Sequence, residues 1–269
     1  MIAVVALSSI LATAATPAQT PTPDPCAGLL AELNRPTVGY SPCAAERGTV
    51  VVELGYQNTQ IGPSRSRTAQ IQIAQGFIRY GVTPRFELDL FGPNDVLQRS
   101  AVGGTAGFTD TGIGFKYELQ PASRWEVGFD GLYSTPNGAR TLTAGNATYT
   151  ANADVSYNLT PATSIGSTLS FAATGGSSAA GVHAKYGTFT PSLLVLQQID
   201  VATQAYVEYV DVSRLAPDAG NRAFMDVGIQ RLLGDRLELD VEYGHALTGD
   251  PTLRFNYVGA GFGLLVGKP

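Results

Sequence analysis

Long apolar runs, charged residues and histidines are all scarce in this sequence of 269 residues. Beyond the first residues, no apolar segment reaches the roughly 18–20 residues that a transmembrane helix requires. Charged residues make up only 14% of the chain and the formal net charge is −5, so a basic surface for nucleic acid is not expected. Few windows show apolar residues at helical spacing. These shortages argue against a bundle of transmembrane helices and against a nucleic-acid-binding protein.

Glycine, tyrosine and phenylalanine are frequent instead, with 31, 12 and 11 copies. A unit of strand, short turn and strand first appears at residues 78–90, where Pro84 fixes the φ angle of the turn. The second strand of this unit alternates large apolar side chains with carboxylates (Phe86, Leu88, Leu90; Glu87, Asp89). Similar units recur at residues 117–129, 157–165 and 231–241. This hairpin repeat, with a period of roughly 35–40 residues, indicates an all-β architecture.

The apolar alternation marks about twelve strands, joined by links that are alternately long and short. Long loops are expected near residues 58–66, 92–108, 135–147, 173–182, 213–222 and 245–253. A transmembrane antiparallel β-barrel has this asymmetry, with short turns and both termini in the periplasm and long loops outside. Aromatic residues near both ends of the strands match two membrane-interface girdles, whereas a soluble barrel would pack them in its core. The sequence therefore predicts a transmembrane barrel of the bacterial cell outer membrane.

The N-terminal residues have features of an exported protein. Residues 2–15 are apolar or small and lead into a sequence that resembles a signal-peptidase site, so residues 1–18 are interpreted as a signal peptide. The basic residues that usually precede such a segment are missing, and a short buried helix is the alternative. Residues 16–25 are rich in proline and are expected to form an extended linker.

Cys26 and Cys43 are the two cysteines of the chain. In an exported protein, a pair this close in sequence is most simply a disulfide, whose loop closure is worth about 3 kcal/mol. A metal site would need further ligands nearby, but His183 and His245 lie far away in sequence, and we expect neither metal nor cofactor. The chain then divides into a signal peptide (1–18), a periplasmic Pro-rich, disulfide-stapled segment (19–47) and an outer-membrane barrel (48–269). The stapled segment could obstruct the periplasmic mouth of the barrel.

Charged side chains opposite the lipid-facing rows must face water or one another, because exposure to hydrocarbon is costly. A barrel of this size has room for a narrow pore. For any single carboxylate, a packed polar interior that supports the wall is the alternative. The carboxylates outnumber one lysine, so any aqueous path is predicted to prefer cations; Arg79 would join that lysine if a bulge at Gly76 turned it inward. The candidate pore-lining residues are Glu53, Glu87, Asp89, Lys116, Glu118, Glu126, Asp130, Asp154, Glu208, Asp226, Glu238, Asp240 and Glu242.

Four stretches, at residues 47–56, 80–88, 109–117 and 234–239, are similar to outer-membrane β-barrels of the phenol-degradation meta-pathway transporter family. The resemblance extends over roughly residues 34–262 and implies an outer-membrane barrel that passes hydrophobic or aromatic compounds. Its motifs are strand and turn patterns, so it implies no particular site residue. Residues 257–264 also resemble the C-terminal signal that the outer-membrane assembly machinery reads.

We interpret the chain as an outer-membrane channel or transporter for small, hydrophobic or aromatic compounds. A structural or adhesive barrel without transport is the alternative, since the glycine-rich loops at residues 103–107 and 175–178 carry no ligand chemistry. A hydrolase is disfavoured because neither His183 nor His245 has a nucleophile in a His-x-Ser arrangement, and both are expected in surface loops. The expected partners are outer-membrane lipids, the assembly machinery and a small-molecule solute.

Overall fold

The computed structural model describes residues 24–64, 66–122, 124–178, 180–248 and 254–267. The predicted signal peptide, residues 1–18, lies outside the described residues. One short helix, α1 (Leu29–Glu32), precedes the strands in the described part of the chain. The strands are β1 (Val50–Ile61), β2 (Thr68–Thr83), β3 (Phe86–Phe91), β4 (Asp95–Ser100), β5 (Gly103–Phe108), β6 (Thr111–Ala122), β7 (Trp125–Thr135), β8 (Thr148–Thr160), β9 (Thr163–Ser177), β10 (His183–Asp200), β11 (Thr203–Val212), β12 (Arg222–Leu233), β13 (Leu237–Ala246) and β14 (Phe255–Val266).

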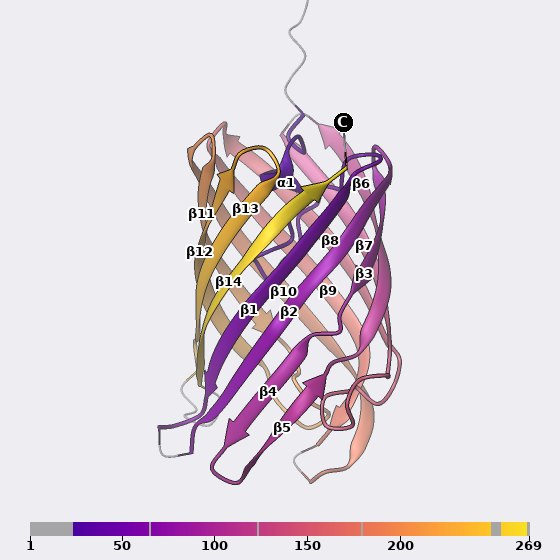
Figure 1. Cartoon of the computed structure of the whole chain (residues 1–269), viewed down its shortest axis with the longest axis vertical. Helices are drawn as coiled ribbons and strands as arrows, with labels where there is room; N and C mark the ends of the chain where they lie inside the picture. Colours follow the sequence, from indigo (N-terminus) through magenta and orange to yellow (C-terminus); the bar gives the residue numbers. More distant parts are fainter. Residues whose placement is uncertain (1–23, 65, 123, 179, 249–253, 268–269) are drawn as a thin grey trace, which may run out of the picture.

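The strands close into an antiparallel barrel (Figure 1), as the alternating pattern predicts. Closure comes from β1, which pairs with β14 on one side and with β2 on the other. Strands β3 and β4 both pair with β2, at its C-terminal and N-terminal parts, and so act as successive pieces of one wall strand. Strand β5 pairs with β4 alone and extends the wall as a hairpin. The barrel therefore has the predicted twelve strands.

Side chains alternate between the interior and the outer surface along each strand. On the outside, Leu90 and Ile113 are 54% and 59% exposed, and aromatic pairs such as Trp125 with Tyr157 lie on the same surface. An apolar outer wall of this kind fits the hydrocarbon core of a bilayer. In the part of the chain that the structure describes, no helix has the length and apolar content to span a membrane.

The pairing of β1 with β2 contains one β-bulge. Ala74 is the extra residue, with a φ of 58°, because Gly55 pairs with Gln75 and the next residue of β1 pairs with Ile73. The prediction of a bulge at Gly76 was therefore wrong by two residues. The bulge switches the outward row of β2 from odd to even residue numbers, and Arg79 points inward.

Two further expectations about loops need correction. Residues 92–108, expected as a loop, contain the β4–β5 hairpin. It was missed because half of β5 is glycine and the apolar residues of β4, Val96 and Leu97, are adjacent. Both histidines lie near strand ends, His183 at the start of β10 and His245 near the end of β13.

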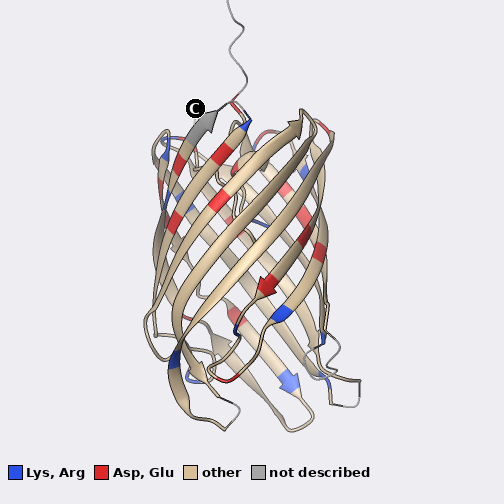
Figure 2. Ribbon diagram, turned by 180° about the vertical axis from the view of Figure 1, so that it is seen from behind, with Lys and Arg blue, Asp and Glu red and all other residues tan. Residues whose placement is uncertain are grey.

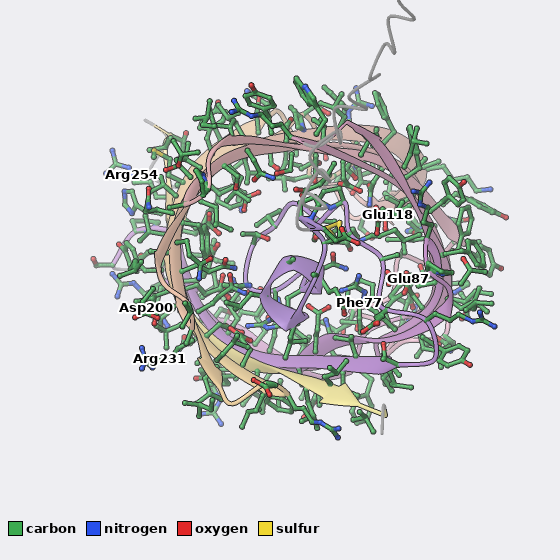
Figure 3. The ribbon with its side chains drawn as sticks, turned by 90° about the horizontal axis from the view of Figure 1, so that it is seen from above. Phe77, Glu87, Glu118, Asp200, Arg231 and Arg254 are labelled. Atoms are coloured by element: carbon green, nitrogen blue, oxygen red, sulfur yellow. A yellow bond between two sulfur atoms is a disulfide. The ribbon has the colours of Figure 1, made fainter. Side chains whose placement is uncertain are left out.

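Residues 24–49, called the plug below, lie inside the barrel (Figure 3). Helix α1 sits near the end of the barrel that carries the short turns and the C-terminus (Figure 1). Leu29, Leu33 and Ala45 of the plug pack with Val51 of β1 in a small apolar cluster. Most acidic positions on the strands lie in the same half of the barrel (Figure 2). The polar half of the lumen therefore surrounds the plug.

Candidate functional site: the plug and the lumen

All thirteen predicted pore-lining residues point inward and are buried. Figure 3 shows Glu87 and Glu118 directed into the barrel, whereas Asp200, Arg231 and Arg254 point outward. The structure distributes the thirteen around the wall: Glu53 on β1; Glu87 and Asp89 on β3; Lys116 and Glu118 on β6; Glu126 and Asp130 on β7; Asp154 on β8; Glu208 on β11; Asp226 on β12; Glu238, Asp240 and Glu242 on β13.

Two glutamates bind the middle of the plug. Glu53 Oε2 accepts hydrogen bonds from the backbone N–H groups of residues 34 and 35, at 3.0 and 2.7 Å. The two carboxylate oxygens of Glu208 accept from the N–H groups of residues 38 and 39, at 2.7 and 2.8 Å. Hydrogen bonds to an ionised acceptor are stronger than those between neutral groups. Each carboxylate thus fixes two consecutive peptide groups.

Glu118 and Glu87 bind the last part of the plug. Glu118 Oε2 accepts the N–H of Ala44 at 3.1 Å, and Glu87 Oε2 accepts the N–H of Ala45. A buried N–H group without an acceptor costs about 1–3 kcal/mol. The plug joins a described strand only near its end, where Arg47 bridges to Gly81. For residues 44 and 45 the wall carboxylates therefore supply the acceptors that the backbone requires.

Arg79 bridges the plug and two carboxylates. Its guanidinium lies 2.9 Å from Glu53 Oε1 and 2.9 Å from Glu87 Oε1. It also donates to the carbonyl of Glu32, and at 3.0 Å to the carbonyl of Cys43. Arg79 is fully buried, and its charge is matched by these carboxylates, as burial requires.

Two more cations link the plug to the wall. Lys116 Nζ donates to Asn34 Oδ1 at 3.0 Å and to the carbonyl of Ser41. Arg35, which belongs to the plug, reaches Asp240 Oδ1 at 3.0 Å. Arg35 was missed as an interior residue because it lies in an irregular segment, where no alternation indicates direction. For Arg79 a signal was present, since its neighbours in sequence, Ile78 and Tyr80, both face outward.

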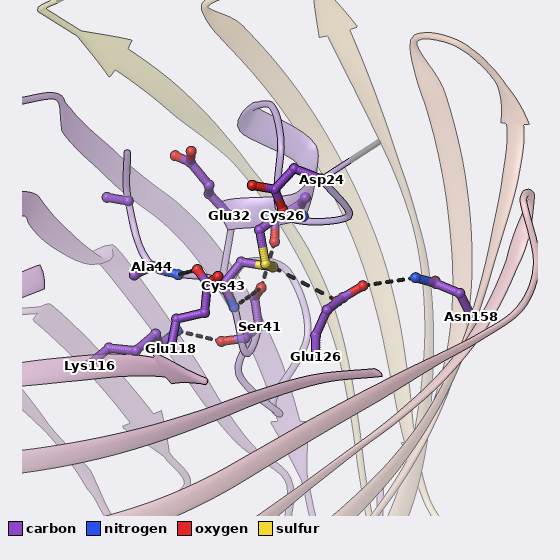
Figure 4. Close-up of a disulfide and its surroundings, with 12 residues drawn as sticks. Asp24, Cys26, Glu32, Ser41, Cys43, Ala44, Lys116, Glu118, Glu126 and Asn158 are labelled. Atoms are coloured by element: carbon purple, nitrogen blue, oxygen red, sulfur yellow. Dashed lines mark hydrogen bonds between the residues drawn. A yellow bond between two sulfur atoms is a disulfide. The ribbon is translucent and has the colours of Figure 1, made fainter. Parts of the chain in front are cut away.

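Cys26 and Cys43 form the predicted disulfide (Figure 4). The Cys43 sulfur lies 3.8 Å from Glu126 Oε2, and Glu126 Oε1 accepts from Asn158 Nδ2 at 2.9 Å. The two sulfurs and a Glu126 oxygen lie within 4.8 Å of one another, as metal ligands would. Metal binding needs thiolates, however, and both sulfurs are used in the disulfide. The disulfide closes the plug into a loop beside β7.

Burial alters two titratable groups of the plug. It raises the pKa of the Glu32 carboxyl to about 7, against the opposing effect of the Arg79 guanidinium. It also raises the pKa of the Tyr40 phenol above its usual value, and the charges of Asp130 and Asp154 add to this effect. Tyr40 is therefore neutral at physiological pH, while Glu32 titrates near it.

Two cavities meet at the wall beside the β-bulge. The first, about 350 Å³, lies in the lumen between the plug, β1, β2 and the loop after β3. The second, about 470 Å³, is lined by outward-facing residues such as Ile78, Leu90 and Ile113. Both cavities are bounded by residues 76–77 and 91–92.

Aromatic rings form the boundary between these cavities. Phe77 of β2 and Phe91 of β3 pair across the strands, with ring centroids 5.6 Å apart, and Tyr40 of the plug lies 5.7 Å from Phe77. The β3–β6 pairing ends at Phe91 and Gly112, and the chain continues to the β4–β5 hairpin, whose β4 pairs with β2. The β2 pairing passes from β3 at Phe77 to β4 at Ile73, so the strand ladder is interrupted between residues 74–76 and 92–94, next to these rings.

Beyond the plug, one side of the lumen carries an apolar cluster. Val210, Phe224, Ala246, Phe255 and Tyr257 are buried together there, on strands β11 to β14. Phe255 and Phe224 stack edge to face with centroids 5.3 Å apart. The interior thus combines a polar half that holds the plug with an apolar cluster on one side of the long-loop end.

Comparisons with known proteins agree with this architecture. The sequence model of a family described as "Putative MetA-pathway of phenol degradation" matches residues 20–264. No curated protein matches the chain. An outer-membrane channel from Pseudomonas putida F1 is 13% identical, with a TM-score of 0.64 over 86% of this chain and 100% of that one. The NanC porin is 10% identical, with a TM-score of 0.52 over 78% of this chain and 98% of that one. The fold is therefore that of an outer-membrane β-barrel.

Proposed function

This chain belongs to that phenol-degradation family, and we propose that it is an outer-membrane channel for small hydrophobic or aromatic compounds. The relative from Pseudomonas putida F1 is itself described as an outer-membrane channel. The observation that carries the proposal is the pair of cavities that share residues 76–77 and 91–92 across the wall. An apolar solute could move between the lumen and the lipid-facing side at that point.

The size and lining of the lumenal cavity fit a compound with one aromatic ring. Its volume, about 350 Å³, lies at the lower end of the range for small-molecule sites. Phe77, Phe91 and Tyr40 offer ring faces and edges to a solute. Gln57 and Gln75 on the same cavity can hydrogen-bond a single polar substituent.

The axial route through the barrel is a poor path for hydrated solutes, because the plug occupies the polar half of the lumen. Four wall glutamates, Glu53, Glu87, Glu118 and Glu208, hold its backbone there. Rearranging this segment means breaking several charge-assisted hydrogen bonds at once. A side path past Phe91 would leave these plug hydrogen bonds in place.

Uptake of a radiolabelled aromatic hydrocarbon, toluene, by cells with an intact outer membrane tests the proposal. Cells that make the protein should take up toluene faster than cells without it. Phe91→Trp, which fills the boundary between the cavities, should slow uptake several-fold. Phe171→Trp is the matched control, since Phe171 faces outward on β9 and stacks on Phe189 away from either cavity. Equal uptake with and without the wild-type protein would instead favour a structural or adhesive barrel.

A further inference from the structure

A group of oxygen atoms behind the plug has no hydrogen-bond donor. Asp130 Oδ2 on β7 and Asn152 Oδ1 and Asp154 Oδ2 on β8 are buried and unpartnered. The three residues are 4%, 6% and 1% exposed. All three atoms are acceptors, so no member of the group can satisfy another when the carboxylates are ionised.

The sheet register places these side chains on one face. Asp130 and Asn152 are directly paired across β7 and β8, which brings inward-facing side chains within about 5 Å at Cβ. Asp154 lies two residues further along β8, on the same face, and its carboxyl contacts that of Asp130. The uncharged Asn152 therefore adds an unpaired oxygen on the same face, opposite Asp130 and two residues from Asp154.

Lys116, the basic residue nearby, does not hydrogen-bond to the unpartnered oxygens. Lys116 Nζ lies 3.6 Å from Asp130 Oδ1, and it also contacts Asn34, Ser41 and the Tyr40 ring of the plug. The other oxygen of Asp130, Oδ2, is the unpartnered one. The carboxylate thus has one oxygen directed to Lys116 and one directed elsewhere.

We propose that Asp130, Asn152 and Asp154 bind a hard, oxygen-preferring cation of the calcium class, which links the wall to the plug. Carboxylate and amide oxygens are the ligands that such cations prefer, with water completing the coordination. The link to the plug runs through Thr168 of β9. Its hydroxyl donates to Asp154 Oδ1 at 2.6 Å and accepts the N–H of Tyr40 at 2.9 Å. A cation on Asp154 would therefore order the peptide around Tyr40.

Calcium binding to the purified full-length protein tests this site. The protein is refolded in synthetic detergent without lipopolysaccharide, which itself binds divalent cations, and is titrated calorimetrically with calcium chloride. Wild-type protein should bind calcium, and Asp154→Asn should weaken binding by about tenfold or more. Asp226→Asn is the matched control, because Asp226 is an equally buried carboxylate whose Oδ2 accepts from the Tyr257 hydroxyl.

Hydrogen exchange supplies the structural readout. Calcium should slow amide exchange around Tyr40 in the wild-type protein and in Asp226→Asn, but not in Asp154→Asn. Asn152→Ala removes an uncharged ligand and should also weaken calcium binding. It replaces Asp154→Asn in the test if that variant fails to form a heat-modifiable barrel. Absence of calcium binding by the wild-type protein would overturn the proposal and leave a shared proton between Asp130 and Asp154 as the explanation. Unchanged affinity in both variants would overturn it equally.

Discussion

At the scale of single residues, the main finding is that acidic side chains serve as acceptors for an irregular backbone. Glu208 is the clearest case, since its two oxygens bind two consecutive N–H groups of the plug. A carboxylate can accept from both, whereas an amide has one oxygen and presents an NH₂ group on the other side. The charge and the acceptor-only character of glutamate are both used here.

Glu208→Gln should loosen the plug without disrupting the barrel. One plug N–H would face a donor instead of an acceptor, at a cost of about 1–3 kcal/mol. Amide exchange of the peptide spanning residues 34–42, measured by mass spectrometry, should become about tenfold faster. Asp226→Asn, directly opposite on β12, makes no plug contact among the described hydrogen bonds and should leave this exchange unchanged. Equal exchange in both variants would contradict the role of Glu208.

Glu32 should make the stability of the folded plug depend on pH. Because burial raises its pKa from about 4.5 to about 7, the folded state binds the proton more tightly than the unfolded state. The contribution of Glu32 to the free energy of unfolding is therefore fully present below pH 4.5. As the pH rises towards 7, the free energy of unfolding falls by about 3 kcal/mol at most. Glu32→Gln should reduce the fall in thermal stability between pH 5 and pH 8. A pH profile identical to that of the wild type would contradict this assignment.

At the scale of elements, glycines in the barrel strands leave room for the backbone of the plug. A Cβ at Gly128 of β7 would lie 2.7 Å from the Pro42 carbonyl oxygen and 2.8 Å from its Cα. Gly128→Ala should therefore displace the plug and speed amide exchange around residue 42, while the barrel remains heat-modifiable. Gly166→Ala is the matched control, because a Cβ at that inward-facing position of β9 meets its nearest atom at 3.5 Å. Similar behaviour of the two variants would show that plug contact does not depend on Gly128.

The sequence predicted the strands of the barrel better than it predicted the contacts in the barrel interior. Alternation alone predicted the twelve wall strands, because an outer face in lipid requires apolar side chains at every second position. It also identified every wall carboxylate discussed above as inward-facing. What those carboxylates bind did not follow, since the plug has no periodic pattern and its contacts join residues far apart in the chain, as with Arg35 and Asp240. The β4–β5 hairpin was missed because half of β5 is glycine and the two apolar residues of β4, Val96 and Leu97, are adjacent.

At the scale of the whole molecule, the interior carries far more acid than base. The twelve candidate carboxylates face Lys116, Arg79 and Arg35 as basic partners in the described lumen. Charges of one sign in a low-dielectric enclosure attract counter-ions. Any water-filled path that opens when the plug moves should therefore prefer cations, with a preference that weakens as the salt concentration rises.

Single-channel recording in planar lipid bilayers tests most directly whether the wall glutamates keep the lumen closed by holding the plug. Wild-type protein should show small conductance steps, because residues 24–49 occupy the polar half of the barrel. The double variant Glu53→Gln/Glu208→Gln should show larger steps, with a reversal potential in a potassium chloride gradient that indicates cation preference. Conductance equal to that of the wild type, in a double variant that forms a heat-modifiable barrel, would contradict the account.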